Sequence, residues 1–406
     1  MLDEVARVRY REGMAMGRPM VTPGVSVGDV LELIRARAVV TRADLRRLTG
    51  LSRTAVTLRV EQLLGHGLVT ERADGGSTGG RPPARLAFNP NSGVVYAVSL
   101  GAGRSQVAVC DLAGDVLAEA EFATVGRPEE VLVIAAEQLD ALQAAVPGGR
   151  PVYGVGVGVP SAVDVATGHS MSLSTGPGRG DIAVAEYFTD RFGVPVRVDS
   201  DVNVLALAEQ ARHPEIRDLL LLKASTGIGA GIIAGGRLQR GAWGGAGEIG
   251  HIKVAGAADR QCGCGDHGCL ETVAAGWALL KELADRGTPV SGLPGLMELV
   301  RAGDPDALRL MREAGRRIGE VVAAAVNLLN PAVIVVRGDL SHAAEPLVAG
   351  LRERIYQQSS ALATRSLRIE PGSIDAPTGV QACAAMILDQ VLAADSVNAR
   401  LGGVPV

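Results

Sequence analysis

The chain has 406 residues, of which 47% are hydrophobic, 21% charged and 3% aromatic, and its net charge is -4. This length exceeds that of one ordinary core, so it predicts a small module attached to a larger body divided into lobes, with the composition of a soluble globular protein. No apolar stretch is long enough to span a bilayer, and residues 1–11 are charged without an apolar core. We therefore expect a cytoplasmic protein without a membrane segment or a secretion signal.

The charge is distributed unevenly along the chain. Residues 1–90 hold 14 Arg, no Lys and 9 Asp or Glu, whereas the remainder holds 26 basic and 35 acidic side chains. A basic segment on an acidic body indicates that the segment meets a polyanion. Arginine without lysine suits bidentate contacts to phosphate and guanine.

Residues 26–49 have the pattern of two capped helices. Ser26 is placed to cap the first helix, whose apolar residues follow the 3.6-residue period. Thr41 caps the second helix, and Asp44 follows three residues later as in a capping box. We expect Leu45 and Leu48 to point inward.

Gly50 permits a sharp turn into a third helix, which Ser52 caps. Apolar residues recur at helical spacing along this helix, so the short polar side chains and the arginine near its N-terminus lie on other faces. Two helices joined through a glycine turn, with such side chains at the start of the second, are the geometry that enters a DNA major groove. The predicted DNA contacts are Ser52, Arg53, Thr54 and Thr57. A small helical bundle with no role in DNA binding is the alternative interpretation.

Two short strands, 68–70 and 85–88, flank a Gly-rich segment that contains Arg81 and predict a wing. The Gly-Arg-Pro tip is flexible and cationic, which suits insertion of Arg81 into a narrow minor groove. The alternative interpretation of Arg81 is a solvated linker residue.

The body begins with an alternation of strands and a helix. Strands are predicted over residues 94–100 and 106–110, with a third after the turn at Gly114, and then a helix over 129–145 and a buried strand over 152–159. This order resembles the nucleotide-binding lobe of the actin and sugar-kinase superfamily.

A second lobe is predicted to begin near residues 195–198. It continues through a strand over 219–223 and contains the loop 225–231, with the sequence Ser-Thr-Gly-Ile-Gly-Ala-Gly. Such glycine spacing lets backbone N–H groups approach a phosphate, and it also fits any tight hairpin.

Three of the five cysteines crowd into residues 262–269, with glycines between them that permit a tight wrap. The other two stand alone in apolar runs, so a reducing compartment is favoured over a disulfide framework. Three thiolates and one imidazole close a tetrahedron, which predicts structural zinc without an open catalytic position. The spacing leaves His251 and His267 open as the fourth ligand.

Four stretches carry a resemblance to a known family. They are 199–203 (Asp-Ser-Asp-Val-Asn) with Ala208-Glu209 after it, 226–231 (Thr-Gly-Ile-Gly-Ala-Gly), 247–251 (Gly-Glu-Ile-Gly-His) and 262–271 (Cys-Gly-Cys-Gly-Asp-His-Gly-Cys-Leu-Glu). Together they resemble the ROK family (repressors, open reading frames and kinases). The resemblance implies an α/β fold in which a winged helix-turn-helix precedes a two-lobed, actin and sugar-kinase-like (ribonuclease-H-like) domain.

The resemblance also implies the residues of a metal site and a sugar site. In the family the cysteine cluster and the histidine of the Gly-Glu-x-Gly-His segment hold zinc, which implies the ligands His251, Cys262, Cys264 and Cys269. The family binds a sugar between its lobes, and the matching residues here are Asp201, Glu248, His251 and Glu271. In the kinases the aspartate deprotonates the attacking sugar hydroxyl.

Three departures from the kinases bear on activity. The Asp-x-Gly-Gly-Thr phosphate loop of the kinases is replaced here by Ser-Leu-Gly-Ala-Gly at residues 99–103. The usual Glu-Asn-Asp is Asp199-Ser200-Asp201, and a later Gly-Gly near the nucleotide is Arg337-Gly338. Loss of the loop aspartate and threonine removes contacts to the nucleotide and its metal, so we expect sugar binding without phosphorylation.

We therefore expect a DNA-binding head over residues 1–90 and a sugar-sensing body with one zinc over residues 91–406. The expected function is a sugar-responsive repressor, a homodimer or homotetramer that binds a double-stranded operator and a sugar, amino sugar or sugar phosphate. Two alternatives are a ROK sugar kinase with an appended DNA-binding head and a constitutive DNA-binding protein whose body only dimerises.

Overall fold

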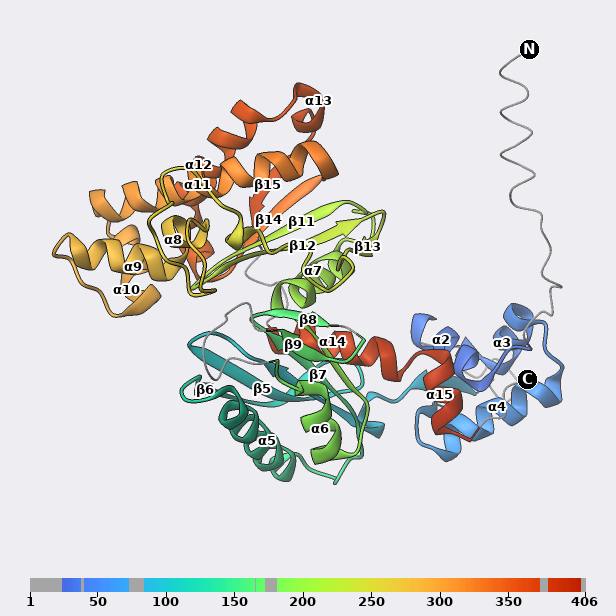
Figure 1. The fold of residues 1–406 in the computed structure, drawn as a ribbon. Helices are drawn as coiled ribbons and strands as arrows, with labels where there is room; N and C mark the ends of the chain where they lie inside the picture. Colours follow the sequence, from blue (N-terminus) through green and yellow to red (C-terminus); the bar gives the residue numbers. More distant parts are fainter. Residues whose placement is uncertain are drawn as a thin grey trace, which may run out of the picture. The chain divides into compact units, whose positions relative to one another are not determined.

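The computed structural model describes residues 24–37, 40–72, 84–164, 166–171, 181–372 and 379–402 (Figure 1). These residues form two compact units, and the chain passes between them twice. The first unit, here called the head, contains the residues up to Asn89 together with those from Leu392 onward. The second unit, the body, is Pro90–Val391.

The head is a helix-turn-helix with a small sheet. Its elements are α2 (Val27–Arg37), β1 (Val40–Thr41), α3 (Arg42–Thr49), α4 (Arg53–Gly65), β2 (Val69–Arg72), β3 (Arg85–Phe88) and α15 (Ala394–Arg400). The three strands pair antiparallel in the order β1-β3-β2.

The predicted helix caps are confirmed. Asp44 donates its backbone N–H to the Thr41 hydroxyl, and the Asp44 carboxylate accepts the Thr41 N–H, which completes the capping box. Ser52 accepts the N–H of Ala55 at 3.2 Å and begins α4. Gly50 between the two helices adopts φ +71°, a conformation that glycine tolerates without strain.

The core of the head is formed by buried aliphatic side chains from α2, α3, α4, the sheet and the residue before β2: Leu31, Ile34, Leu45, Val56, Val60, Leu63, Leu68 and Leu86. Leu48, which was expected to point inward, is 39% exposed, so that prediction is wrong. Leu48 lies about 60° around the helix from Leu45 and falls outside the narrow strip that the core covers.

The body contains two five-stranded mixed sheets, which confirms the predicted two-lobed α/β architecture. The first sheet has the order β10-β7-β4-β5-β6. Its elements are β4 (Val94–Ser99), β5 (Arg104–Asp111), β6 (Val116–Ala123), α5 (Pro128–Ala145), β7 (Val152–Val159), α6 (Val184–Phe192) and β10 (Val196–Ser200), with the small hairpin β8 (Ala162–Asp164) and β9 (His169–Met171).

The second sheet has the order β13-β12-β11-β14-β15. It is built from β11 (Leu219–Ala224), β12 (Ile228–Ala234), β13 (Arg237–Leu238), β14 (Val333–Arg337) and β15 (Arg368–Pro371). The helices of this region are α8 (Glu271–Ala274), α9 (Gly276–Asp285), α10 (Gly292–Arg301), α11 (Pro305–Leu329), α12 (Ala344–Gln358) and α13 (Ala361–Thr364).

The chain enters the second lobe later than predicted. Residues 195–198 were expected to open that lobe, but β10 pairs in parallel with β7 and is the edge strand of the first sheet. Helix α7 (Asp201–Arg212) follows β10 directly, packs on β11 and β12, and also contacts α14 (Gly379–Val391). The second sheet therefore begins with β11.

The alternating glycines of β7 let a helix approach the first sheet closely. Val155 and Val157 face the core beneath α5, whereas the intervening Gly156 faces α14. A Cβ atom on Gly156 would lie 2.1 Å from the carbonyl oxygen of Cys383. Any side chain there would force α14 away from the sheet.

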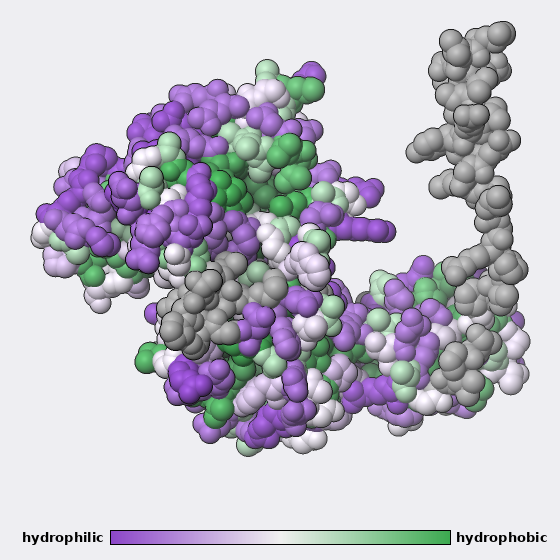
Figure 2. All heavy atoms as spheres, viewed as in Figure 1, coloured by the Kyte–Doolittle hydropathy of each residue, from purple (hydrophilic) through white to green (hydrophobic). Residues whose placement is uncertain are grey.

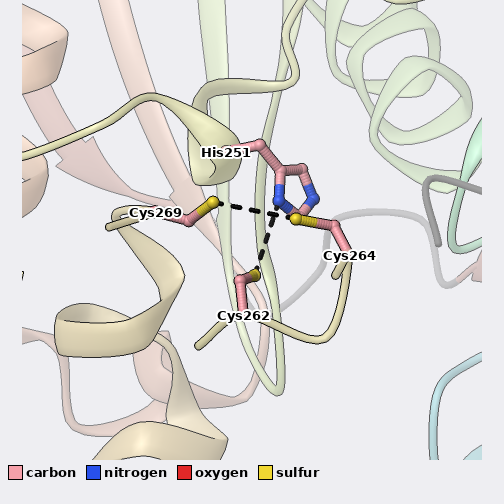
Figure 3. Close-up of side chains that lie close together, drawn as sticks. All are labelled: His251, Cys262, Cys264 and Cys269. Carbon is pink, nitrogen blue, oxygen red and sulfur yellow. Dashed lines mark hydrogen bonds between the residues drawn. The ribbon is translucent and has the colours of Figure 1, made fainter. Parts of the chain in front are cut away.

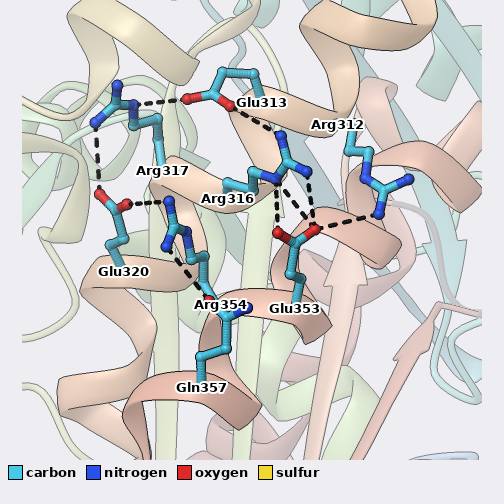
Figure 4. Close-up of polar contacts among 8 residues, drawn as sticks. All are labelled: Arg312, Glu313, Arg316, Arg317, Glu320, Glu353, Arg354 and Gln357. Atoms are coloured by element: carbon cyan, nitrogen blue, oxygen red, sulfur yellow. Dashed lines mark hydrogen bonds and ion pairs between the residues drawn. The ribbon is translucent and has the colours of Figure 1, made fainter.

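A network of ion pairs joins the long helices α11 and α12 (Figure 4). Glu353 accepts hydrogen bonds from Arg316 at 3.1 Å and Arg312 at 3.2 Å, and Glu320 pairs with Arg317 and Arg354. The surface over the second-lobe helices is mainly hydrophilic (Figure 2). These partly exposed pairs add modestly to stability because water screens each of them.

The C-terminal segment groups with the head, whereas the sequence analysis assigned it to the body. Residues from Leu392 onward were assigned to the body, but α15 packs on α2 in the head. Among the described residues, no single helix is long and apolar enough to cross a membrane. Helices α14 and α15 together reach that length only across a bend, and most of α14 is buried in the protein.

Candidate functional site

The start of α4 presents polar side chains to solvent. Ser52, Arg53 and Thr54 are exposed and Thr57 is half-buried, while the opposite face of the helix holds the core residues. Within the described part of the chain, Arg53 has no hydrogen-bond or ion-pair partner, so its guanidinium is available to a ligand. Arg81, the predicted minor-groove contact, lies outside the described residues.

Arg59 has a different role from Arg53. Its guanidinium donates to the carbonyl oxygen of Val25 at 2.6 Å and to that of Ala55 at 3.1 Å. Arg59 therefore ties α4 to the segment before α2.

Four side chains in the second lobe gather into one cluster, and they come from two separated segments (Figure 3). The ligand atoms of His251, Cys262, Cys264 and Cys269 all lie within 4.8 Å of one another. Cys262 Sγ is 3.7 Å from His251 Nδ1, and Cys264 Sγ is 3.7 Å from Cys269 Sγ. His267 is exposed and is not part of the cluster, so the geometry selects His251 as the fourth member.

The cluster fits a tetrahedral metal ion. Zn–S bonds of about 2.3 Å give a tetrahedron whose edges are about 3.8 Å, close to the separations of the donor atoms. Burial is the main cause that raises the pKa of the Cys262 thiol to about 12; a hydrogen bond from the Cys264 backbone lowers it, and the thiols of Cys264 and Cys269 raise it. A bound dication would reverse this direction, because a coordinated thiol is deprotonated.

His251 lies between the cysteine cluster and a carboxylate. Its Nδ1 faces the cysteines, and its Nε2 lies 3.9 Å from the Glu248 Oε2 atom. Burial, together with the charges of Asp201 and Glu271, raises the pKa of Glu248 to about 7. The structure thus brings together all four residues that the sequence assigned to a sugar.

Glu271 also shapes the loop between β11 and β12. Its Oε1 accepts the N–H of Ile228 at 2.7 Å. A Cβ atom on Gly227 would lie 2.6 Å from the same oxygen, so the glycine loop runs directly against this carboxylate. Carboxylates and an imidazole arranged in this way can make paired hydrogen bonds to neighbouring hydroxyl groups.

Asp199, in contrast, is a structural residue. It is 1% exposed, and its two oxygens accept hydrogen bonds from Ser200 N–H, Asn203 Nδ2 and the Arg240 guanidinium, all at 2.8 Å. These bonds fully occupy the carboxylate, so it is not available to a ligand.

Replacing Arg240 with alanine is expected to destabilise the body by about 3 kcal/mol, because a buried carboxylate loses its only cation among the described residues. The exposed Arg237 nearby is the matched control, and its replacement should cost no more than about 0.5 kcal/mol. Urea titration of the two variants measures the difference. Equal urea midpoints for the two variants would show that the Arg240–Asp199 ion pair adds nothing to the free energy of unfolding.

Two further cations reach α7 from the second sheet. Lys223 on β11 forms an ion pair with Asp201, at the start of α7. Arg337 on β14 donates to Glu209 at 3.2 Å, two turns further along the helix. Lys223 and Arg337 are paired in register on adjacent strands, so their side chains lie on the same face of the sheet.

Lys223 and Arg240 were missed by the sequence analysis. Lys223 could have been noticed, because it is one of three lysines in the chain and follows four consecutive leucines in a buried strand. Arg240 follows a two-residue strand in a Gly-rich loop, and nothing in that local pattern indicates a partner 41 residues earlier.

Part of the stretch 99–103, for which the sequence analysis expected a changed phosphate loop, lines an apolar cavity. The cavity has a volume of about 210 Å³ and lies at the carboxyl ends of β4 and β7, where Leu100, Gly101 and Ala102 face Val159 and Pro160. The described residues around it carry no charged side chain. Such a lining offers no cation to a phosphate group.

Comparison with known proteins covers both units. The sequence model of the ROK family matches residues 95–390. The xylose repressor of Caldicellulosiruptor bescii is 28% identical over 382 residues, which cover 89% of this chain and 95% of the relative. The N-acetylglucosamine repressor of Escherichia coli O6:H1 is 30% identical over 373 residues, covering 87% and 90% of the two chains.

Two solved structures differ in how much of this chain they match. A ROK family transcriptional regulator, a homolog of the E. coli MLC protein, superposes with a TM-score of 0.75 over 92% of this chain at 23% identity and shares the fold. A ROK family glucokinase from Streptomyces griseus, in complex with glucose and AMPPNP, superposes with a TM-score of 0.62 at 26% identity. The glucokinase match covers 99% of that enzyme but only 72% of this chain.

Proposed function

Because the chain belongs to the ROK family, we propose that it is a transcriptional repressor that binds an operator with its head and responds to a sugar bound in its body. The observation that carries the proposal is the presence, in one chain, of a capped helix whose Arg53 has no partner among the described residues and of a cluster of carboxylates with His251. The named relatives support it, because they are repressors and the matches span about nine-tenths of their length or more.

The head supports DNA binding through side chains that already point to solvent. Arg53 can form two hydrogen bonds to a guanine edge or pair with a phosphate, and Ser52, Thr54 and Thr57 can add shorter contacts. A single recognition helix contacts few base pairs, so we propose a homodimer or a dimer of dimers that reads two half-sites.

The body supports recognition of a sugar, an amino sugar or a sugar phosphate. The repressors named for xylose and for N-acetylglucosamine favour this ligand class. We propose that His251, Cys262, Cys264 and Cys269 hold zinc, which would fix the His251 ring so that its Nε2 can donate to a sugar hydroxyl. Glu248 and Glu271 would accept hydrogen bonds from neighbouring hydroxyls, and Asp201 would accept one more.

The same residues do not favour phosphoryl transfer. In a kinase the aspartate must be free to take the proton of the attacking hydroxyl. Here the Lys223 ammonium is bonded to Asp201, and Arg337 fills space at the end of β14 by pairing with Glu209. The described residues that line the cavity at Leu100 to Ala102 also include no cationic side chain that could pair with a nucleotide's phosphates.

Replacing Glu248 with glutamine is expected to weaken sugar binding at least tenfold, because the carboxylate is lost as a strong acceptor while the shape of the side chain is kept. A thermal-shift screen of sugars, amino sugars and their phosphates first identifies the best ligand, and titration then compares the variant with the native chain. Glu298, exposed on α10, provides the control Glu298→Gln. Equal sugar affinity in Glu248→Gln and the native chain would place the ligand elsewhere.

A further inference from the structure

The C-terminal helix α15 is built into the DNA-binding head. It packs on α2, and its Val397 is 2% exposed (Figure 1, red helix beside the blue head). The two helices meet at Gly28, where a Cβ atom would lie 2.2 Å from the carbonyl oxygen of Ala394. Only glycine permits this separation.

α15 also supplies a cap for α2. The first N–H groups of a helix have no partner within the helix. The N–H of Gly28 is one of them, and it donates to Asn398 Oδ1 at 2.8 Å, across 370 positions of sequence. Residues at the far end of the chain therefore complete the first helix of the head.

In the body, the helix that precedes α15 lies beside the ligand site. The side of Gly158 that faces α14 is bounded by Cys383 Sγ at 3.1 Å and by the Cα atom of Asp201 at 3.8 Å, measured from the position of a Cβ atom. α14 also packs along α7, which begins at Asp201. A displacement of α7 on ligand binding would also displace α14, because the interface between the two helices is close-packed.

Only Leu392 and Ala393 separate the two helices, and Leu392 is 1% exposed. We infer that α14 and α15 form the connection through which ligand binding in the body changes operator binding by the head. This inference rests on the proposed function and adds the path of the signal. α15 would act as a part of the head that the body moves through a two-residue joint.

An insertion tests the connection in the full-length chain. Four residues, Gly-Ser-Gly-Ser, are placed between Leu392 and Ala393, and operator affinity is measured with and without the best sugar. We expect sugar affinity and sugar-free operator affinity to stay within about threefold of native. The ratio of the two operator affinities should fall from the about 5- to 150-fold range of allosteric proteins to about 1.

Two control insertions use the same four residues. One is placed in the exposed turn at Gly148-Gly149, where it should leave the ratio unchanged. The other is placed between Asn89 and Pro90, at the second passage between the units. The inference would be overturned if the Leu392–Ala393 insertion kept the native ratio of operator affinities with and without sugar. It would also be overturned if that ratio fell to about 1 only in the Asn89–Pro90 insertion.

A point variant keeps the test decisive if the insertion prevents operator binding. Asn398→Ala removes one hydrogen bond and leaves the joint intact, so it should speed amide hydrogen exchange at Gly28 and reduce the ratio at least twofold. An unchanged ratio together with faster exchange would overturn the role in signalling. A native chain whose operator affinity no sugar alters would instead contradict the proposed function, while the exchange at Gly28 would still test the position of α15.

Discussion

Replacing His251 with alanine is expected to remove the metal from the chain, whereas replacing His267 should leave it in place. The two histidines lie 16 residues apart and the sequence pattern allowed either, but only His251 lies within 4.8 Å of the cysteine donors. Removing one of four ligands opens the site to water and weakens zinc binding strongly, since most of the binding free energy comes from the complete donor set. Elemental analysis after dialysis should give about one zinc per chain in the native protein and in His267→Ala, and close to none in His251→Ala.

The same preparations show what the metal does. His251→Ala removes the imidazole as well as the metal that it would hold, so sugar binding should weaken in this variant while the unfolding of the head is unchanged. Because thiolates bind the metal in deprotonated form, acid should promote its release from the native chain. Zinc content near zero in His267→Ala and near one in His251→Ala would reverse the assignment.

Replacing Arg53 with alanine is expected to weaken operator binding by about 1 to 3 kcal/mol, a factor of roughly 5 to 150. Arg53 is exposed in the first turn of α4, where it can reach a base edge or a phosphate. Its removal should also reduce the salt dependence of binding if it pairs with a phosphate, because one fewer counterion is released. Fluorescence anisotropy with a labelled operator at several salt concentrations gives both quantities.

Arg127→Ala is the matched control for this prediction. Arg127 is a 75% exposed arginine of the body, before α5, and its loss changes the net charge equally. A folded Arg53→Ala chain with native affinity and native salt slope would show that α4 is not the recognition helix.

Local chemistry made most of the head predictable. Thr41 with Asp44, and Ser52 before α4, are cap signals that act within three residues, so the sequence contains the whole interaction. The cysteine cluster was predictable for the same reason, since the donor types and their spacing determine the chemistry. Choosing His251 over His267 required either the family resemblance or the three-dimensional structure.

Features that depend on distant partners were not predictable. The residues of β10 predict a short strand, but they do not indicate that this strand pairs with β7 in the first sheet. α15 has a largely polar sequence with one deeply buried side chain, Val397, and its partner lies at the opposite end of the chain. Lys223 on β11 forms an ion pair with Asp201 on α7, so its role is apparent only once the second sheet is packed against α7.

We propose that this chain senses a sugar to control DNA binding and does not phosphorylate it. The most direct test mixes the protein with labelled operator, ATP, magnesium and the best sugar from the thermal screen, and measures operator affinity beside sugar-dependent ADP release. We predict that the sugar changes operator affinity by at least about fivefold while ADP release stays at background. Turnover at roughly 1 to 100 per second with an unchanged operator affinity would instead identify a sugar kinase with an appended head.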